Sequence, residues 1–143
     1  GTPMGVEAKR FMHAGELVPD GVILGIIGEA LEHDDSGGGF LLDGFPRTVA
    51  QAEGLQVLLA DQGLALDAIV NLVVDDAEIG KRLSTRGRKD DTVDTIRRRL
   101  EVYRADTRPV LEWYENHDTR VVSVKGVGDI EEIQAHILER LGL

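Results

Sequence analysis

A chain of 143 residues is long enough to form one compact domain with its own core. Its formal net charge of -10 argues against a nucleic-acid surface or an anionic membrane as partner. The chain contains no cysteine, which excludes disulfides and thiolate metal sites and is compatible with a reducing compartment. The aliphatic run 22–27 is far too short to span a bilayer, and no signal peptide is visible.

The first part of the chain is predicted to form two helices joined by a turn. The first covers residues 6–14 and ends at Gly15. The second runs over 21–32, with Asp20 placed to cap it. The inward residues of the first helix are expected to be Val6, Phe11 and Ala14. The second helix has apolar residues at helical spacing, namely Val22, Ile23, Ile26, Ile27 and Leu31.

A short strand is predicted after the polar, glycine-rich loop 33–39. Residues 40–42 form an apolar run, typical of a strand buried on both faces of a parallel sheet. Asp43 follows at the strand's carboxyl end, where ligands bind in open α/β sheets. Gly44 lets another molecule approach the backbone, and Arg47 follows the turn. A carboxylate can bind a metal ion or its water, and a guanidinium can donate two parallel hydrogen bonds to a phosphate. This stretch therefore suits phosphate chemistry.

Each of these residues also has a plainer interpretation when taken alone. Asp43 can be a cap at a strand end, and Arg47 can be a solvated side chain. An amphipathic helix is predicted over 48–62 with Gln51 in its first turn, where the amide offers both a donor and an acceptor. Considered alone, Gln51 fits a solvated helix residue. The buried stripe of this helix is expected to be Ala52, Leu55, Leu58 and Leu59.

The second half of the chain alternates strands and helices. The run 68–74 is β-branched and almost wholly apolar, so it is expected inside a sheet. Pro109 is expected to kink or break a long helix, and Trp113 and Tyr114 are expected to pack. The alternation points to a parallel three-layer α/β sheet. The other predicted elements are helices at 77–84, 92–116 and 129–141, a strand at 120–124, and a loop at 126–128.

Many of the basic residues lie between Lys81 and Arg108, a positive island that suits a small anionic ligand. Phosphoryl transfer needs preorganised positive charge around the transferred oxygens, which arginines supply in pairs of N–H donors. From spacing alone, a solvated charged face with ion pairs to neighbouring aspartates remains open. The arginines considered for this role are Arg82, Arg86, Arg88 and Arg99.

The stretch Gly39-Phe40-Leu41-Leu42-Asp43-Gly44-Phe45-Pro46-Arg47-Thr48-Val49-Ala50-Gln51 resembles the strand-turn-helix signature of adenylate kinases, in register over thirteen positions. The resemblance covers essentially the whole chain. It implies a three-layer parallel sheet of the P-loop nucleoside monophosphate kinase type. The implied reaction is reversible transfer of the ATP γ-phosphoryl group to AMP, giving two ADP, with Mg²⁺ bound with ATP. It also implies a cytoplasmic protein, a monomer when complete, with small nucleotides as partners and neither nucleic acid nor membrane.

The resemblance assigns one set of residues to AMP. Leu17 and Val18 would lie against its adenine, and Gln51 would pair with the edge of that base. Without the resemblance, packing of Leu17 and Val18 between the arm and the body is an equally good interpretation. The full expected AMP set is Leu17, Val18, Gly44, Arg47 and Gln51.

A second set is assigned to ATP and to the transferred group. Arg82 would stack on the ATP adenine, Arg86 would contact ATP phosphates, and the loop with Gly126 and Gly128 would approach the ATP base. Asp91 would orient the arginines near the transferred phosphoryl group. Asp43 would act on Mg²⁺ through water, and no residue is expected to bind a metal directly. The expected catalytic set is Arg88, Arg99, Asp91 and Asp43.

The resemblance also predicts a single domain over 1–143. Residues 1–20 would form part of the AMP-binding arm, 21–81 and 92–143 the core, and 82–91 a very short lid without metal ligands.

No Gly-x-x-Gly-x-Gly-Lys sequence appears in the chain, and the resemblance begins partway into the family's sequence, so the fold is expected to be truncated at its N-terminus. Such a chain is expected to be inactive alone. A missing central strand would leave the 40–42 and 69–73 strands with unpaired edges, which invites a strand-completing partner. The alternative is a non-catalytic module that binds AMP or a partner.

Overall fold

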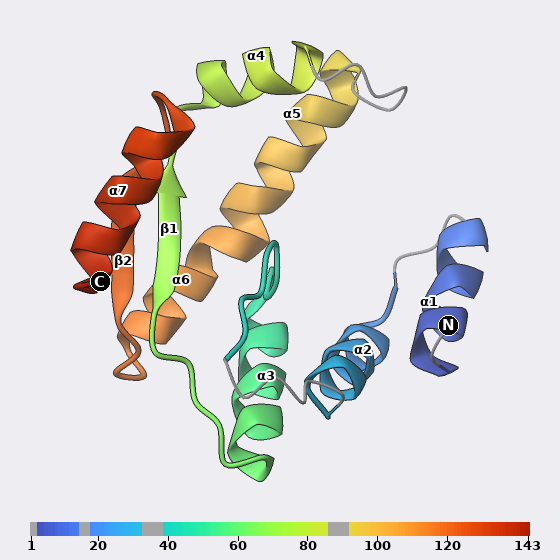
Figure 1. The fold of residues 1–143 in the computed structure, drawn as a ribbon. Helices are drawn as coiled ribbons and strands as arrows, with labels where there is room; N and C mark the ends of the chain where they lie inside the picture. Colours follow the sequence, from blue (N-terminus) through green and yellow to red (C-terminus); the bar gives the residue numbers. More distant parts are fainter. Residues whose placement is uncertain (1–2, 15–17, 33–38, 86–91) are drawn as a thin grey trace. The chain divides into compact units, whose positions relative to one another are not determined.

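The computed structural model describes residues 3–14, 18–32, 39–85 and 92–143, with only the backbone of Pro3 and of 11–14. The chain divides into two compact units, Gly1–Ala65 and Leu66–Leu143 (Figure 1). This boundary differs from the arm, core and lid that the sequence suggests, and the single domain stays a prediction.

The described residues of the first unit form three helices: α1 (Pro3–Ala14), α2 (Asp20–Glu32) and α3 (Val49–Asp61). α1 packs against α2, and α2 packs against α3. The predicted inward position of Val6 is wrong, because its side chain is 55% exposed. Among the side chains of α1 that the structure describes, that of Ala8 is buried. The side chains of Phe11 and Ala14, and all of Gly15, lie outside the described residues.

α2 has the predicted apolar face, with Val22 buried and the other four residues of the set partly buried. The predicted capping role of Asp20 is wrong. Asp20 is the first residue of the helix, and the backbone N–H groups of Val22 and Ile23 instead donate to the Pro19 carbonyl at 3.0 and 3.2 Å. The Asp20 carboxylate is therefore directed elsewhere, toward α3.

α3 follows the predicted pattern closely. Thr48 caps it, its hydroxyl accepting the backbone N–H of Gln51 at 3.1 Å. Ala52, Leu55 and Leu59 are buried, and Leu58 is half-buried. α3 also approaches α2 closely, since a Cβ at Gly54 would overlap the Leu24 side chain.

The predicted strand at 40–42 is not formed. Among the described residues the sheet contains two strands, and neither includes this segment. Leu41 is 87% exposed, so the expected burial on both faces is also wrong. A strand needs a hydrogen-bonded neighbour, and an apolar run by itself does not provide one.

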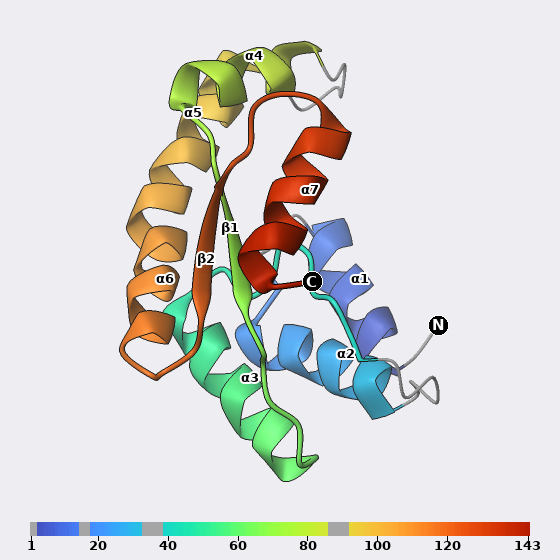
Figure 2. The same ribbon diagram turned by 60° about the vertical axis from the view of Figure 1, so that its left-hand side comes forward.

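The second unit is built on a parallel pair of strands, β1 (Ile69–Val73) and β2 (Val121–Lys125). Ile69 pairs with Val121 and Val73 with Lys125. α7 (Ile130–Leu141) covers one face of this pair and α6 (Arg108–Glu115) lies on the other, as Figures 1 and 2 show from two directions. The helix–sheet–helix layers confirm the predicted α/β class with a parallel sheet.

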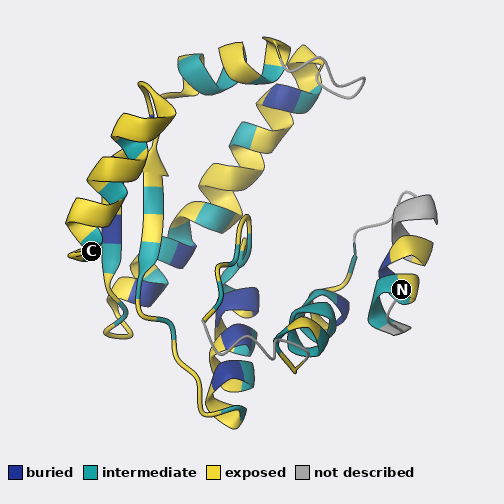
Figure 3. Ribbon diagram, viewed as in Figure 1, coloured by how far each residue is buried: buried dark blue, intermediate teal, exposed yellow. Residues whose placement is uncertain are grey.

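The two strands differ in burial. Val122 and Val124 of β2 are buried, as expected for a covered strand (Figure 3). β1 is not covered in the way its composition predicts, because Val70, Leu72 and Val73 are 39%, 49% and 53% exposed. In the described part of the chain β1 pairs on one side only, so its apolar residues lack the second neighbouring strand that would help to bury them.

The predicted helices of this unit are present, with one interruption. α4 (Asp76–Thr85) and α5 (Val93–Val102) are followed by a π-helical segment, η1 (Tyr103–Thr107), and then by α6. Pro109 lies at the start of α6, and the Arg108 N–H bonds to the Tyr103 carbonyl five residues back. The helix is therefore not broken at Pro109, because the backbone continues through a widened helical turn into α6, and the alternative of a kink stays a prediction.

Packing by the two aromatic residues of α6 is also confirmed. Tyr114 is 3% exposed, and Trp113 meets it edge-on with ring centroids 5.0 Å apart. Trp113 also stacks on His117 at 4.0 Å. The Tyr114 hydroxyl is buried without a hydrogen-bond partner in the described part of the chain, and burial raises the pKa of Tyr114 to about 12.

Replacing Tyr114 by phenylalanine is expected to raise the free energy of unfolding by about 1 kcal/mol at neutral pH, because it removes a buried hydroxyl that lacks a partner. The folded state holds the phenolic proton more tightly than the unfolded chain, whose pKa is near 10.0. That contribution is complete below pH 10 and is lost as the pH rises toward 12, so the advantage of the variant should widen there. Urea denaturation of both proteins at pH 7 and pH 11 measures this, and a constant difference would contradict it.

Candidate functional site

A cavity of about 240 Å³ lies in the first unit. It combines three residues of the expected AMP set, Gly44, Arg47 and Gln51, with apolar side chains that are not part of that set. The cavity is slightly smaller than the roughly 300–1,000 Å³ pockets of drug-sized ligands, so it suits one ring system better than a whole nucleotide. The apolar lining residues are Ile23 and Ile27 of α2 and Phe45 of the turn before α3.

Gln51 is buried, with 6% of its surface exposed, so the alternative of a solvated helix residue is wrong. Its Oε1 accepts the backbone N–H of Arg47 at 2.8 Å, and its Nε2 donates to Asp20 Oδ1 at 2.8 Å. Each end of the amide thus has one fixed partner and keeps one further hydrogen-bonding position, an N–H on Nε2 and a lone pair on Oε1.

The sequence contains a signal for the contact between Gln51 and the backbone of Arg47. Thr48-x-x-Gln51 has the form of a capping box, in which the residue three places after the cap reaches back to a free backbone N–H. Here the amide reaches the N–H of Arg47, one residue before the cap. The bond to Asp20 spans 31 residues along the chain, and no local pattern predicts it.

Arg47 folds back over the turn that precedes α3. Its Nε donates to the Gly44 carbonyl at 2.7 Å. Gly44 has φ +69°, and a Cβ built on it would lie 3.2 Å from Arg47 Nη2. Glycine therefore permits both the backbone turn and the close approach of the guanidinium at the wall of the cavity.

The other described residues expected near the AMP site do not line the cavity. Val18 is half-buried and does not line the cavity, and Leu17 lies outside the described residues. Asp43 is exposed and also does not line the cavity.

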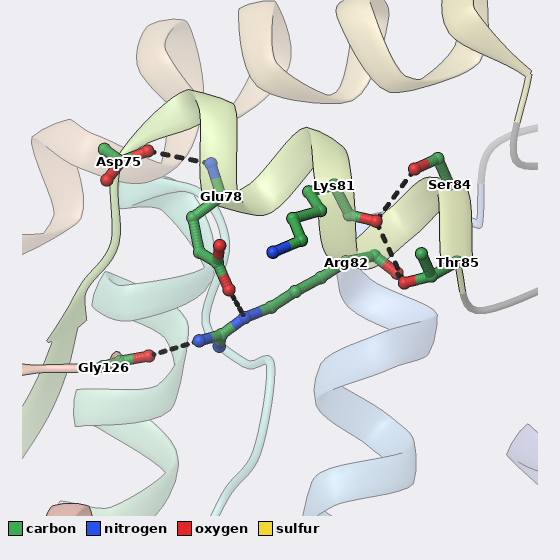
Figure 4. A network of polar contacts seen from close by, with 7 residues as sticks. All are labelled: Asp75, Glu78, Lys81, Arg82, Ser84, Thr85 and Gly126. Atoms are coloured by element: carbon green, nitrogen blue, oxygen red, sulfur yellow. Dashed lines mark hydrogen bonds and ion pairs between the residues drawn. The ribbon is translucent and has the colours of Figure 1, made fainter. Parts of the chain in front are cut away.

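In the second unit, the structure brings together two residues of the expected ATP set. Arg82 of α4 donates from Nη2 to the Gly126 carbonyl at 2.9 Å and from Nε to Glu78 Oε1 at 2.7 Å (Figure 4). Asp75 in turn accepts the Glu78 backbone N–H at 2.8 Å. The guanidinium therefore connects α4 to the loop that follows β2.

Glu78 and Asp75 were missed from the sequence, although two local signals point to them. Asp75 lies three residues before Glu78 at the start of α4, which is capping-box spacing. Glu78 and Arg82 are four apart on one helix face, with the acidic residue on the N-terminal side.

The loop after β2 is tightly packed at its first glycine. Gly126 is buried, and a Cβ there would lie 2.8 Å from Val74 Cγ2. Its N–H donates to the Val73 carbonyl at 2.9 Å, which continues the ladder between the strands. Gly128 has φ +130°, a conformation that favours glycine.

The structure describes only two residues of the expected catalytic set, Asp43 and Arg99. Arg99 lies on the exposed side of α5, while Arg86, Arg88 and Asp91 fall outside the described residues.

Within 3–14, 18–32, 39–85 and 92–143, no group of three or more histidine, aspartate or glutamate side chains is arranged to hold a metal ion. The helices of the same ranges include none that is both long and apolar enough to cross a bilayer.

Comparison with known proteins gives one consistent answer. A family model described as adenylate kinase matches residues 1–119. The chain is 46% identical to an adenylate kinase of Corynebacterium aurimucosum, over 99% of this chain and 77% of the relative. It is 48% identical to one of Nocardioides sp. and 45% identical to one of Leptospira biflexa, again over 99% of this chain, and covers 75% and 77% of those relatives. The α/β fold with its parallel sheet agrees with this, and the chain belongs to the adenylate kinase family.

Proposed function

We propose that the chain carries the AMP site and the arginine residues of an ATP:AMP phosphotransferase, which reversibly transfers the ATP γ-phosphoryl group to AMP to give two ADP. The observation that carries the proposal is the cavity of the first unit, where Gln51 presents a buried amide of fixed orientation beside Arg47 and Gly44. Membership of the adenylate kinase family supports the reaction.

In this proposal the cavity takes the adenine of AMP. Ile23, Ile27 and Phe45 give the base an apolar surface, and Gln51 hydrogen-bonds its edge. Arg47 lines the same cavity and carries a guanidinium that suits the phosphate. Leu17 and Val18 complete the AMP contacts.

ATP is proposed to bind the second unit. Arg82 is held between Glu78 and the Gly126 carbonyl, so its planar guanidinium is restrained beside the loop proposed to approach the ATP base. Restraining a planar cation in advance lowers the entropy that stacking on a base would otherwise cost. Arg86 and Gly128 are proposed as further ATP contacts.

Arg88 and Arg99 are proposed to contact the transferred phosphoryl group, with Asp91 orienting the arginines. Mg²⁺ keeps several of its waters and binds through one or two carboxylates plus substrate phosphates, so an exposed carboxylate such as Asp43 fits a water-mediated role. Bound with ATP, the ion would neutralise charge on the phosphates. The proposed compartment is the cytoplasm, and the proposed state of the complete enzyme is a monomer.

A second candidate is a non-catalytic module that binds AMP or a partner. It is favoured by the exposed apolar residues of β1, since Val70, Leu72 and Val73 present an uncovered strand to which another strand could be added. The two candidates differ in whether phosphoryl transfer can be restored.

The test is a coupled assay of ADP formation from ATP and AMP, on the 143-residue polypeptide alone and with an added peptide that supplies a P-loop strand and helix. The polypeptide contains no Gly-x-x-Gly-x-Gly-Lys sequence, so little or no activity is expected from it alone. Activity restored by the peptide is the expected result.

The outcomes separate the candidates. No transfer with the peptide, together with retained AMP binding, favours the non-catalytic module. Rates near those of complete adenylate kinases from the polypeptide alone would overturn the expectation about the P-loop.

A further inference from the structure

We propose that Asp20 is a positioning residue that locks the amide of Gln51 in one orientation and thereby makes the cavity select 6-amino over 6-oxo purine nucleoside monophosphates. The inference rests on the proposed function, because it assumes that the cavity receives the base of a nucleoside monophosphate. It goes further by assigning a role in base selection to a residue outside the cavity lining.

The lock follows from the chemistry of the two partners. A carboxylate such as that of Asp20 accepts hydrogen bonds and donates none, while the backbone N–H of Arg47 donates and cannot accept. Both contacts to the Gln51 amide are 2.8 Å long. Turning the amide by 180° would set its oxygen against the carboxylate and its NH₂ group against an N–H, so both hydrogen bonds would be lost.

The Asp20 carboxylate is available for this bond because its own helix does not use it. The backbone N–H groups of Val22 and Ile23 donate to the Pro19 carbonyl, and the Asp20 side chain reaches across to α3. The contact joins residues at the first turns of two different helices. Asp20 is exposed, and its carboxylate is a charged acceptor, which strengthens a hydrogen bond relative to a neutral acceptor.

The locked amide leaves one N–H and one lone pair for a ligand, and the positions of this donor and this acceptor cannot be exchanged. Adenine offers an amino donor at position 6 beside an acceptor ring nitrogen, which complements this pair. A 6-oxo purine offers an acceptor oxygen beside a ring N–H, the reverse pattern. A freely rotating glutamine serves both bases by turning its amide, because its oxygen and nitrogen ends have nearly the same shape. A glutamine that is held by Asp20 can form both hydrogen bonds only with adenine.

The experiment is calorimetric titration of AMP and IMP, which differ at position 6 and in the adjacent ring N–H, into the full 143-residue chain and its variants. Asp20→Ala removes the carboxylate, and Asp20→Asn keeps an acceptor oxygen but adds a donor that tolerates the turned amide. Asp61→Ala is the matched control, since Asp61 is an exposed carboxylate at the opposite end of α3 from Gln51.

The wild-type chain and Asp61→Ala are expected to prefer AMP to the same extent. Asp20→Ala is expected to lower the ratio of AMP to IMP affinity about tenfold, which corresponds to about 1.4 kcal/mol, and Asp20→Asn to fall between. A fall in both affinities with an unchanged ratio would mean that Asp20 only supports the fold. A wild-type chain that binds AMP without preference over IMP would also overturn the proposal.

A second measurement needs no nucleotide. The side-chain amide of Gln51 is expected to be rigid by ¹⁵N relaxation in the wild-type chain and mobile in Asp20→Ala. A mobile amide in the wild-type chain overturns the lock, whatever the titrations show. A rigid amide in a chain that binds neither nucleotide leaves the lock in place but overturns both the proposed AMP site and the base selection.

Discussion

Replacing Leu55 by alanine is expected to lower the free energy of unfolding by about 2–5 kcal/mol. Leu55 is 0% exposed, and it shares the buried face of α3 with Ala52 at 0% and Leu59 at 2%. The substitution removes three buried carbon atoms and leaves a cavity that neighbouring side chains fill only in part. Since small domains are stable by only about 5–15 kcal/mol, this loss should be among the largest that one side chain can cause.

Val57→Ala is the matched control for Leu55, because it shortens an aliphatic side chain of the same helix that is 62% exposed. Its effect should stay within about 0.5 kcal/mol. Both variants are measured by urea denaturation with the slope of the transition compared as well as its midpoint. Equal losses for the two variants would show that α3 is not buried along the face described.

Replacing Gln51 by leucine is expected to weaken AMP binding by roughly ten- to a hundredfold, because it removes two proposed hydrogen bonds to the base that contribute about 0.5–1.5 kcal/mol each. The substitution removes the proposed contact to the base, and it also leaves the Arg47 N–H and the Asp20 carboxylate without their partner. Calorimetric titration with AMP measures the loss. IMP binding should change much less than AMP binding, because the locked amide of the wild-type chain does not complement a 6-oxo purine.

Gln56→Leu provides the control for Gln51, since it makes the same chemical change at an exposed position of the same helix. AMP affinity should be unchanged in this variant. Thermal melting of both variants checks that each is folded at the temperature of the titration. A folded Gln51→Leu chain that binds AMP like the wild type would remove the main support for the cavity as the AMP site.

Most of the secondary structure could be predicted because it depends on local patterns. The stripe of α3, the β-branched run of β1 and the proline near the start of α6 each act within a few residues of the chain. The segment 40–42 shows the limit of such patterns. Its composition is that of a buried strand, yet strand formation depends on a partner far away in the sequence, and Leu41 is almost fully exposed.

The site residues divide in the same way. Gly44, Arg47 and Gln51 were predicted by type and position, and the structure brings all three to one cavity. Their neighbours from α2 were not predicted as lining residues, because helical spacing shows only that Ile23 and Ile27 share a face. What that face meets is decided by the packing of α2 against α3.

The sequence by itself determined the family resemblance, the α/β class and the chemical groups available to bind a nucleotide, since these depend on residue types at short spacings. The tertiary structure decided which groups meet. It joined Asp20 to Gln51 across 31 residues and Arg82 to Gly126 across 44. A hydrogen bond requires an approach to about 3 Å in a suitable direction, and the packing of helices and strands sets that approach.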